Sequence, residues 1–393
     1  MEEVEKLRKD NMRILLYGIG KDLEDIEIKI KNKHEIIGYT DSFARLKKYK
    51  GKLFYELCTI KKLDFDYLII TLKNRKIAWE IQEMLTGIYG IPLDKIIPFY
   101  VYANRELWNI KMNNYELEKV QGLIFGNSLA ATGFLEKELD IPFVNLAVSS
   151  QDLYYCYQVF CQCIKQYGER FDSLKYIVID LYNYMVFNLD TSRGKDILGY
   201  MYSGGIQDEH NFKDNKNYSN TLENEMFRNY NVILKDQKQD LMQEVFSNWD
   251  TEFEQSSYNR WSHITKYTTL RAEQIIGKSI IQRFEDTFQE NRNIFEHFIK
   301  NIRKFNGDMK IIFTLIPQYI MMEKVSKPFM DDWKDEFYYI INDICERYHS
   351  VFWNFKNCKE ISENPMFYYD EMHLNTVGAR AISAILNEKL NCI

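Results

Sequence analysis

The chain alternates short apolar runs with longer amphipathic stretches, a pattern that predicts β-strands separated by α-helices. Within the first hundred residues, the predicted strands cover residues 12–20, 35–41, 65–71 and 95–100. The clearest helix among them covers residues 74–85. Strands that alternate with helices form a parallel sheet with both faces covered. We therefore expect an α/β domain with a parallel sheet over residues 1–102.

Residues 103–119 are polar and weakly patterned, which is typical of a connector between domains. A second α/β pattern begins at residue 120. Its predicted strands cover residues 122–125, 143–148, 176–181, 310–316 and 351–355, and its predicted helices cover residues 129–138, 151–166, 333–347 and 377–390. We therefore expect a second α/β domain over residues 120–393.

The regular pattern stops between about residues 188 and 275, where Asn, Lys, Asp and Tyr are abundant. A structureless loop of that length is uncommon inside a compact domain. We therefore predict a mostly helical insertion that shapes substrate access and leads into a helical run over residues 270–299.

Composition and charge narrow the class of protein. Hydrophobic residues make up 46% of the 393 residues, enough for a sizeable core, and the net charge is −6 with no long basic block. This balance argues against nucleic acid as the main partner. The longest strongly apolar run, residues 309–322, contains Pro317 and is too short to span a bilayer. The charged residues 1–10 lack the apolar core of a signal peptide.

The seven cysteines are scattered, and an odd number does not pair completely. Cys161 and Cys163 form the only close pair, without the second pair that a structural zinc site requires. The histidines other than His373 show no ligand spacing either. We therefore expect a soluble, cytoplasmic protein with reduced thiols, no metal and no cofactor.

Candidate chemistry begins at Ser128. An apolar run ends in Gly126, Asn127 and Ser128, and a helix-like run follows. A strand–turn–helix of this kind holds the serine in the crevice where open α/β sheets bind ligands, with helix N–H groups directed at it. A nucleophile beside anion-stabilising donors is the minimum equipment for acyl transfer. The alternative is a serine that only caps the helix.

A base candidate lies near the other end of the chain. Asp370 and His373 are three residues apart, which places them on one side of a turn or helix start. The carboxylate can then orient one imidazole nitrogen and leave the other to take the serine proton. Asn375 or Thr376 is expected to begin the last helix. The alternative is a surface histidine near a helix start.

Together these motifs resemble the SGNH, or GDSL-like, hydrolase superfamily. The similarity lies in Gly-Asn-Ser-Leu at residues 126–129 and Asp-x-x-His-Leu-Asn-x-x-Gly at residues 370–378. It covers residues 120–393 apart from the insertion. It implies a three-layer α/β/α fold with a flavodoxin-like parallel sheet, active as an esterase, lipase, carbohydrate deacetylase or O-acyltransferase.

By this resemblance Ser128 is the nucleophile, His373 the general base and then acid, and Asp370 the group that orients His373. The family's second motif supplies a glycine N–H to the oxyanion hole, whereas Ser149 and Ser150 follow the corresponding strand here. The third motif supplies an asparagine in Gly-x-Asn-Asp.

Asn183 is the best match to that asparagine, without the preceding glycine. A backbone N–H needs no particular side chain, so the resemblance implies an oxyanion hole formed by Ser128, Ser150 (or Ser149) and Asn183. Asp152 and Asp180 are further acid candidates, although solvated carboxylates at strand ends are commoner.

The first domain carries a weaker signal. Gly18 and Gly20 form a turn after the first predicted strand, and Asp41 ends the second, a spacing that suggests a dinucleotide site. Leu23 stands where the third glycine of that fingerprint belongs. The alternative is a tight turn that packs strand against helix. Residues 11–100 also resemble the Rossmann-like N-terminal domains of bacterial surface-glycan biosynthesis proteins, through their Y-G-x-G, G-Y-x-D and D-Y-L-I-I-T segments.

The leading functional hypothesis is a serine esterase or O-acyl-transfer enzyme that acts on a small ester, with an acetylated carbohydrate as the expected substrate. One alternative is a catalytically degenerate relative that binds a glycan or nucleotide-sugar. Another is a nucleotide-sugar oxidoreductase that uses the first domain.

Overall fold

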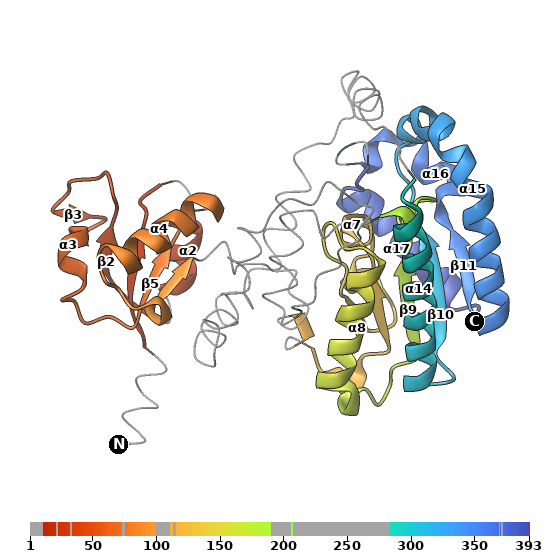
Figure 1. Ribbon diagram of the computed structural model, residues 1–393, viewed down its shortest axis with the longest axis horizontal. Coiled ribbons are helices and arrows are strands. Elements are labelled where there is room, and N and C mark those ends of the chain that lie inside the picture. Colours follow the sequence, from red (N-terminus) through yellow and green to blue (C-terminus); the bar gives the residue numbers. More distant parts are fainter. Residues whose placement is uncertain are drawn as a thin grey trace. The chain divides into compact units, whose positions relative to one another are not determined.

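The computed structural model describes residues 11–20, 23–31, 34–72, 75–98, 111–112, 115–189, 206, 283–368, 370 and 372–393 (Figure 1). These residues divide into two compact units, one ending at residue 98 and the other beginning at residue 111. The predicted insertion lies almost wholly outside the described residues, as does most of the predicted connector.

The first unit is a six-stranded sheet in the order β3-β4-β2-β1-β5-β6. The strands are β1 (Arg13–Tyr17), β2 (Glu35–Thr40), β3 (Lys48–Tyr49), β4 (Lys52–Phe54), β5 (Tyr67–Ile70) and β6 (Ile96–Pro98). The described helices of this unit are α2 (Leu23–Ile30), α3 (Leu57–Ile60) and α4 (Arg75–Gly87).

This sheet is mixed, and the expectation of a wholly parallel sheet is wrong at one edge. β3 pairs antiparallel with β4, whereas the other neighbours are parallel. Lys50 and Gly51 connect the pair with φ values of 48° and 80°. Two consecutive residues with positive φ form the tight turn that suits a two-residue hairpin. The edge strand therefore owes its direction to local turn geometry.

The parallel part of the sheet has a topological switch point. From β1 the chain builds outward through β2 and β4 on one side, then through β5 and β6 on the other. In open α/β sheets, ligands bind at such a point, outside the carboxyl ends of the strands. Gly18 follows β1 and Thr71 follows β5 at this edge.

The second unit contains a parallel five-stranded sheet in the order β11-β10-β9-β7-β8. The strands are β7 (Gly122–Phe125), β8 (Phe143–Asn145), β9 (Tyr176–Asp180), β10 (Lys310–Leu315) and β11 (Val351–Asn354). All five correspond to predicted strands, which confirms the second α/β pattern. The switch point of this sheet lies between β7 and β9, where the chain changes its direction of growth.

The described helices of the second unit are α7 (Ser128–Gly133), α8 (Leu153–Tyr167), α14 (Glu285–Phe305), α15 (Ile320–Tyr348), α16 (Lys359–Ser362) and α17 (Thr376–Leu390). The last helix is confirmed within one residue at its start. The helix predicted over residues 333–347 begins much earlier, at Ile320, and runs through Pro328.

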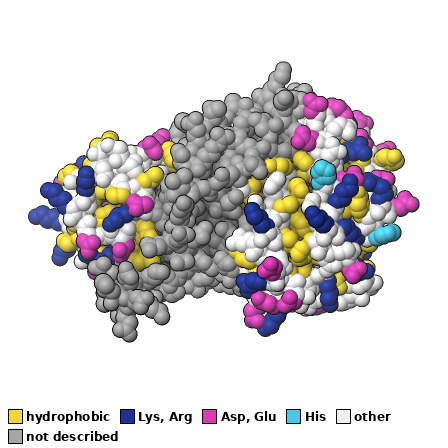
Figure 2. All heavy atoms as spheres, turned by 60° about the horizontal axis from the view of Figure 1, so that its bottom comes forward, with side chains coloured by type: hydrophobic (Ala, Val, Ile, Leu, Met, Phe, Trp, Pro, Cys, Tyr) yellow, Lys and Arg dark blue, Asp and Glu magenta, His cyan; other side chains and the backbone are white. Residues whose placement is uncertain are grey.

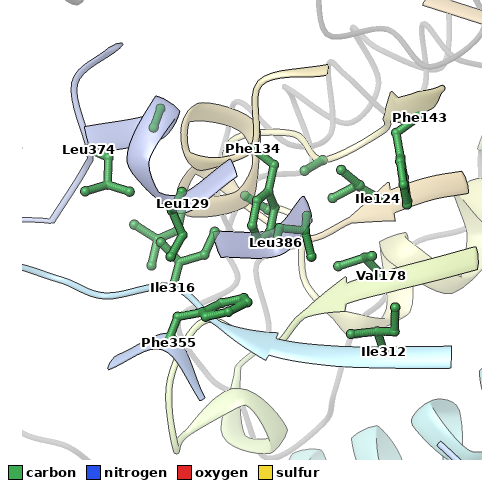
Figure 3. Packing of buried hydrophobic residues seen from close by; sticks show 14 of the residues in the cluster. Ile124, Leu129, Phe134, Phe143, Val178, Ile312, Ile316, Phe355, Leu374 and Leu386 are labelled. Atoms are coloured by element: carbon green, nitrogen blue, oxygen red, sulfur yellow. The ribbon is translucent and has the colours of Figure 1, made fainter. Parts of the chain in front are cut away.

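Helices cover both faces of the second sheet. Ile124, Val178 and Ile312 point from β7, β9 and β10 into one core, together with residues of α7 and α17 (Figure 3). Successive strand residues point to opposite faces. Phe125 accordingly lies on the opposite face of the sheet, where it packs against α8 and α14. Its ring centroid is 6.1 Å from that of Phe160 in α8 and 5.6 Å from that of Phe298 in α14.

The surface charges, the helices and the cysteines complete the description of the fold. Figure 2 shows basic and acidic side chains interspersed over the visible face of the described residues. Among the described helices, none is both long and apolar enough to cross a membrane. All seven cysteines are free thiols.

Candidate active site

The turn after β7 holds Ser128 at the switch point of the second sheet. Gly126 adopts a φ of 152°, and a Cβ there would lie 2.8 Å from Ala130 Cβ and 3.0 Å from Asp180 Cβ. Both contacts are closer than side-chain atoms normally approach, so only glycine fits. The glycine therefore lets the chain turn sharply from the buried strand into α7.

Asn127, rather than Ser128, caps this helix. The Asn127 side chain accepts a hydrogen bond from the Leu129 N–H at 2.9 Å. Ser128 is the first helical residue and is partly exposed. The alternative in which Ser128 is only a capping serine is therefore wrong. Asparagine is as good an N-cap as serine, so the residue type at position 127 already allowed Asn127 to be expected as the cap.

His373 links Ser128 to Asp370. Its Nε2 lies 2.9 Å from Ser128 Oγ, and its Nδ1 lies 3.0 and 2.9 Å from the two carboxylate oxygens of Asp370. Because an ionised carboxylate only accepts hydrogen bonds, Nδ1 is the donor in that contact. Nε2 is then the acceptor for the serine hydroxyl. The arrangement can take a proton from Ser128 and stabilise the resulting imidazolium.

Backbone donors hold the Asp370 carboxylate in place. Its Oδ1 accepts from the N–H groups of Met372 at 2.8 Å and His373 at 2.7 Å. Burial raises the pKa of Asp370, but hydrogen bonds from the His373 ring and from these N–H groups outweigh it and keep the pKa below its usual value. The carboxylate is therefore ionised at neutral pH.

Asn375 ties the loop that carries these residues to the start of α17. Its Oδ1 accepts from the Val377 and Gly378 N–H groups, both at 3.0 Å, which confirms it as the residue that begins the last helix. Its Nδ2 donates to the Met366 carbonyl at 2.7 Å. One buried side chain thus fixes both the helix and the segment before Asp370.

The three oxyanion candidates lie at the same carboxyl edge of the sheet. Ser128 begins α7 after β7, and the first N–H groups of a helix have no acceptor within it. Ser150 follows β8 with a φ of 64°. Asn183 follows β9 and is 7% exposed; its Oδ1 accepts from the Met185 N–H at 2.8 Å, which leaves the Nδ2 amino group as its donor end.

Left-handed backbone recurs beside the serine. Ser150 and Tyr182, with φ values of 64° and 63°, follow the two strands that flank β7. A non-glycine residue in this region costs roughly 1–3 kcal/mol, and such strain clusters at active sites and ligand clamps. Their placement on both sides of Ser128 indicates that the carboxyl edge of this sheet has a functional role.

Asp180 is buried, so the reading of a solvated carboxylate at a strand end is wrong. Its oxygens accept from Thr314 Oγ1 at 3.0 Å, the Ile316 N–H at 3.1 Å and the Tyr182 N–H at 3.2 Å. Burial raises the pKa of Asp180 to about 6. Asp180 therefore binds the ends of β9 and β10 together beneath the site.

Asp152 is likewise buried, and the solvated reading is wrong here too. It is the N-cap of α8 and accepts from the Tyr155 N–H at 3.0 Å.

The sequence analysis did not single out the neighbouring Gln151. It is 2% exposed, and neither polar atom of its side-chain amide has a hydrogen-bond partner among the described residues. No pattern in the sequence distinguishes it.

In the first unit, Gly18, Gly20 and Asp41 line one cavity. The Gly18 N–H donates to the Thr40 carbonyl at 2.9 Å, and Asp41 accepts from the Phe43 N–H at 2.8 Å. The structure thus brings together the three residues that the dinucleotide hypothesis named. Leu23 is buried.

Across the described residues, no group of three or more His, Cys, Asp or Glu side chains is arranged to hold a metal.

Residues 10–97 match the family model described as C2185-like, N-terminal. This match covers the first unit from β1 nearly to the end of β6. No curated protein matches the chain.

Proposed function

We propose that the protein is a serine esterase or O-acyltransferase that acts on a small ester, with an acetylated carbohydrate as the substrate class. The observation that carries this proposal is the hydrogen-bonded series Ser128–His373–Asp370 at a switch point of a parallel sheet. Ser128 is the nucleophile, His373 the general base and Asp370 the group that orients and stabilises it.

The fold supports the assignment of the second unit to the SGNH type. Numbered along the chain, its strands have the order 2-1-3-4-5, which is the flavodoxin-like order. The parallel strands of the first unit have the order 3-2-1-4-5, which supports its description as Rossmann-like. Fold alone does not carry function, so the proposal rests on the three side chains.

In the proposed reaction, Ser128 Oγ attacks the ester carbonyl carbon while its proton moves to His373 Nε2. The negative charge on the carbonyl oxygen is held by the N–H groups of Ser128 and Ser150 and by Asn183 Nδ2. His373 then gives the proton to the departing alkoxide, which leaves an acyl ester on Ser128. Water or a sugar hydroxyl attacks this ester while His373 accepts its proton. The bond between Ser128 Oγ and the acyl carbon then breaks, and His373 returns the proton to Ser128 Oγ.

A second candidate function is binding of a glycan or nucleotide-sugar without turnover. The observation that favours it is the lack of glycine in both oxyanion motifs: Ser149 and Ser150 stand where the second motif has glycine, and Leu181 stands where Gly-x-Asn-Asp has it. Loss of one oxyanion donor typically reduces the rate by about 10²–10³. Turnover by the wild-type protein that depends on Ser128 would exclude this candidate.

Hydrolysis of p-nitrophenyl acetate by wild type, Ser128→Ala and Ser173→Ala tests the proposal. Ser173 precedes β9, at the opposite edge of the sheet, and serves as the matched control. We expect turnover by wild type and Ser173→Ala and its loss in Ser128→Ala. Equal rates in all three proteins, at or near the uncatalysed rate, would contradict the proposed activity.

A further inference from the structure

The turn that presents Asn183 after β9 has an uncommon backbone. The Asn183 N–H donates to the Leu181 carbonyl at 2.6 Å, across Tyr182 with its φ of 63°. A hydrogen bond that spans one residue of positive φ is typical of the classic γ-turn, which is rare and strained. Strained backbone persists only where the surrounding structure holds it. The groups that hold this oxyanion turn (residues 181–183) therefore decide where Asn183 lies.

The buried side chain of Asp180 holds the oxyanion turn at its central residue. Asp180 Oδ2 accepts from the Tyr182 N–H at 3.2 Å. The other oxygen, Oδ1, accepts from Thr314 Oγ1 at 3.0 Å and from the Ile316 N–H at 3.1 Å. One carboxylate oxygen thus fixes the turn, and the other joins β9 to the end of β10.

Asp180 also lies against the turn that carries Ser128. A Cβ on Gly126 would lie 3.0 Å from Asp180 Cβ and 3.4 Å from the Asp180 carbonyl oxygen, so the two backbones are in close contact. The same residue therefore touches the nucleophile turn and holds the oxyanion turn. A misplacement of about 1 Å can lower a catalytic rate about 10²-fold, so this shared contact sets a distance that matters.

The two backbone donors require a carboxylate at position 180. An ionised carboxylate accepts at both oxygens, whereas an asparagine amide accepts at one end and donates at the other. Asparagine could therefore satisfy either the Ile316 N–H or the Tyr182 N–H. Two hydrogen bonds converge on Oδ1 and one on Oδ2, so we expect the amide oxygen to take the Oδ1 place. The amino group would then face the Tyr182 N–H and release the turn.

We infer that Asp180 is the positioning residue of the proposed oxyanion hole, which fixes Asn183 relative to Ser128 through the Tyr182 N–H. Asp180 is only 4% exposed, so it acts through the turn and not on the substrate. The inference rests on the proposed acyl transfer, because the role of Asn183 belongs to that reaction. Loss of the hold by Asp180 should lower kcat at most as far as loss of the Asn183 side chain does.

Two variants separate positioning from a purely structural role. Asp180→Asn keeps the contacts to β10 and loses the one to the turn. Burial raises the pKa of Asp180 because it disfavours the charged form, so the fold should tolerate a neutral amide. Asp180→Thr does the reverse, since a threonine hydroxyl can accept from the N–H two residues later but replaces only one of the two oxygens.

Steady-state kinetics with p-nitrophenyl acetate compares the two variants. We expect kcat to fall about 10²-fold in Asp180→Asn and less than about tenfold in Asp180→Thr, with little change in KM. Asp180→Thr loses more hydrogen bonds, so it should have the lower melting temperature. A fall in kcat of about 10²-fold or more in folded Asp180→Thr would overturn the inference, whether or not Asp180→Asn folds.

A double-mutant cycle tests whether Asp180 acts through Asn183. In an Asn183→Ala background, Asp180→Asn should change kcat less than about threefold, because the donor that Asp180 positions is gone. The matched control Asp308→Asn, at an exposed position on the opposite edge of the sheet, should leave kcat unchanged in both backgrounds. Effects of Asp180→Asn that multiply with those of Asn183→Ala, while turnover still depends on Ser128, would overturn this inference alone. Wild type without Ser128-dependent turnover would instead contradict the proposed function.

Discussion

Replacing Asp370 with asparagine tests the residue of the hydrogen-bonded series that orients His373. Asn keeps one carbonyl oxygen, which can still accept from the Met372 and His373 N–H groups at 2.8 and 2.7 Å. Its amino group, however, replaces an oxygen that lies 2.9 Å from His373 Nδ1. The variant therefore preserves the loop but reverses the direction of one hydrogen bond.

This reversal changes the tautomer of His373. An amino group donates, so Nδ1 becomes the acceptor and the ring proton moves to Nε2. Nε2 then donates toward Ser128 instead of accepting its proton. The same exchange in a serine protease, a worked case for this type of triad, lowers kcat by about 10⁴. We expect a loss of about 10³–10⁴ here, which corresponds to roughly 4–5.5 kcal/mol at 1.36 kcal/mol for each factor of ten.

The assay is kcat/KM for p-nitrophenyl acetate at neutral pH, with Asp308→Asn as the matched control. Asp308 is exposed and precedes β10, at the edge of the sheet opposite Ser128. Circular dichroism should give the same spectrum and melting temperature for wild type and both variants. A fall of less than tenfold in well-folded Asp370→Asn would refute the role given to this carboxylate.

Three further predictions concern the surroundings of Ser128. Asn183→Ala should lower kcat about 10²–10³-fold with little change in KM, because an oxyanion donor acts mainly in the transition state; steady-state kinetics checks this. Gly126→Ala should lower the free energy of unfolding by more than about 2 kcal/mol in urea titrations, because its Cβ would lie 2.8 Å from another side chain. The control Gly307→Ala, whose Cβ would have nothing within 4 Å, should change the free energy of unfolding little. Burial raises the pKa of Asp180 from 3.8 to about 6, so the folded state holds that proton more tightly. Wild type should therefore lose roughly 2 kcal/mol relative to Asp180→Asn between pH 4 and pH 7, as measured by urea unfolding. An equal pH dependence in the two proteins would contradict that assignment.

The site was predictable where its chemistry is local. Ser128 follows a buried apolar run and a glycine turn, and Asp370 stands three residues before His373 at a helix start. These are short-range patterns, and the topology of a parallel sheet brings strand ends to one edge. The contact between Ser128 and His373 joins residues 245 positions apart, and chain order and resemblance alone pointed to it.

Long-range burial was not predictable in the same way. The partners of Asp180 include Thr314, which is 134 residues away, so nothing near Asp180 in the sequence indicates that it is buried and bonded. The β3–β4 hairpin is short and rich in lysine, without the alternation that predicts strands. Pro328 breaks the helical pattern before residue 333, although α15 runs through it.

The central claim is that Ser128 is the nucleophile, and covalent labelling tests it most directly. The protein would be treated with a fluorophosphonate, digested, and analysed by mass spectrometry. The account predicts one label per chain, on Ser128, absent in Ser128→Ala and retained in Ser173→Ala. A protein that stays unlabelled would contradict the claim and favour a binding protein on this fold. A label on another residue that Ser128→Ala retains would also contradict it and would place the nucleophile elsewhere.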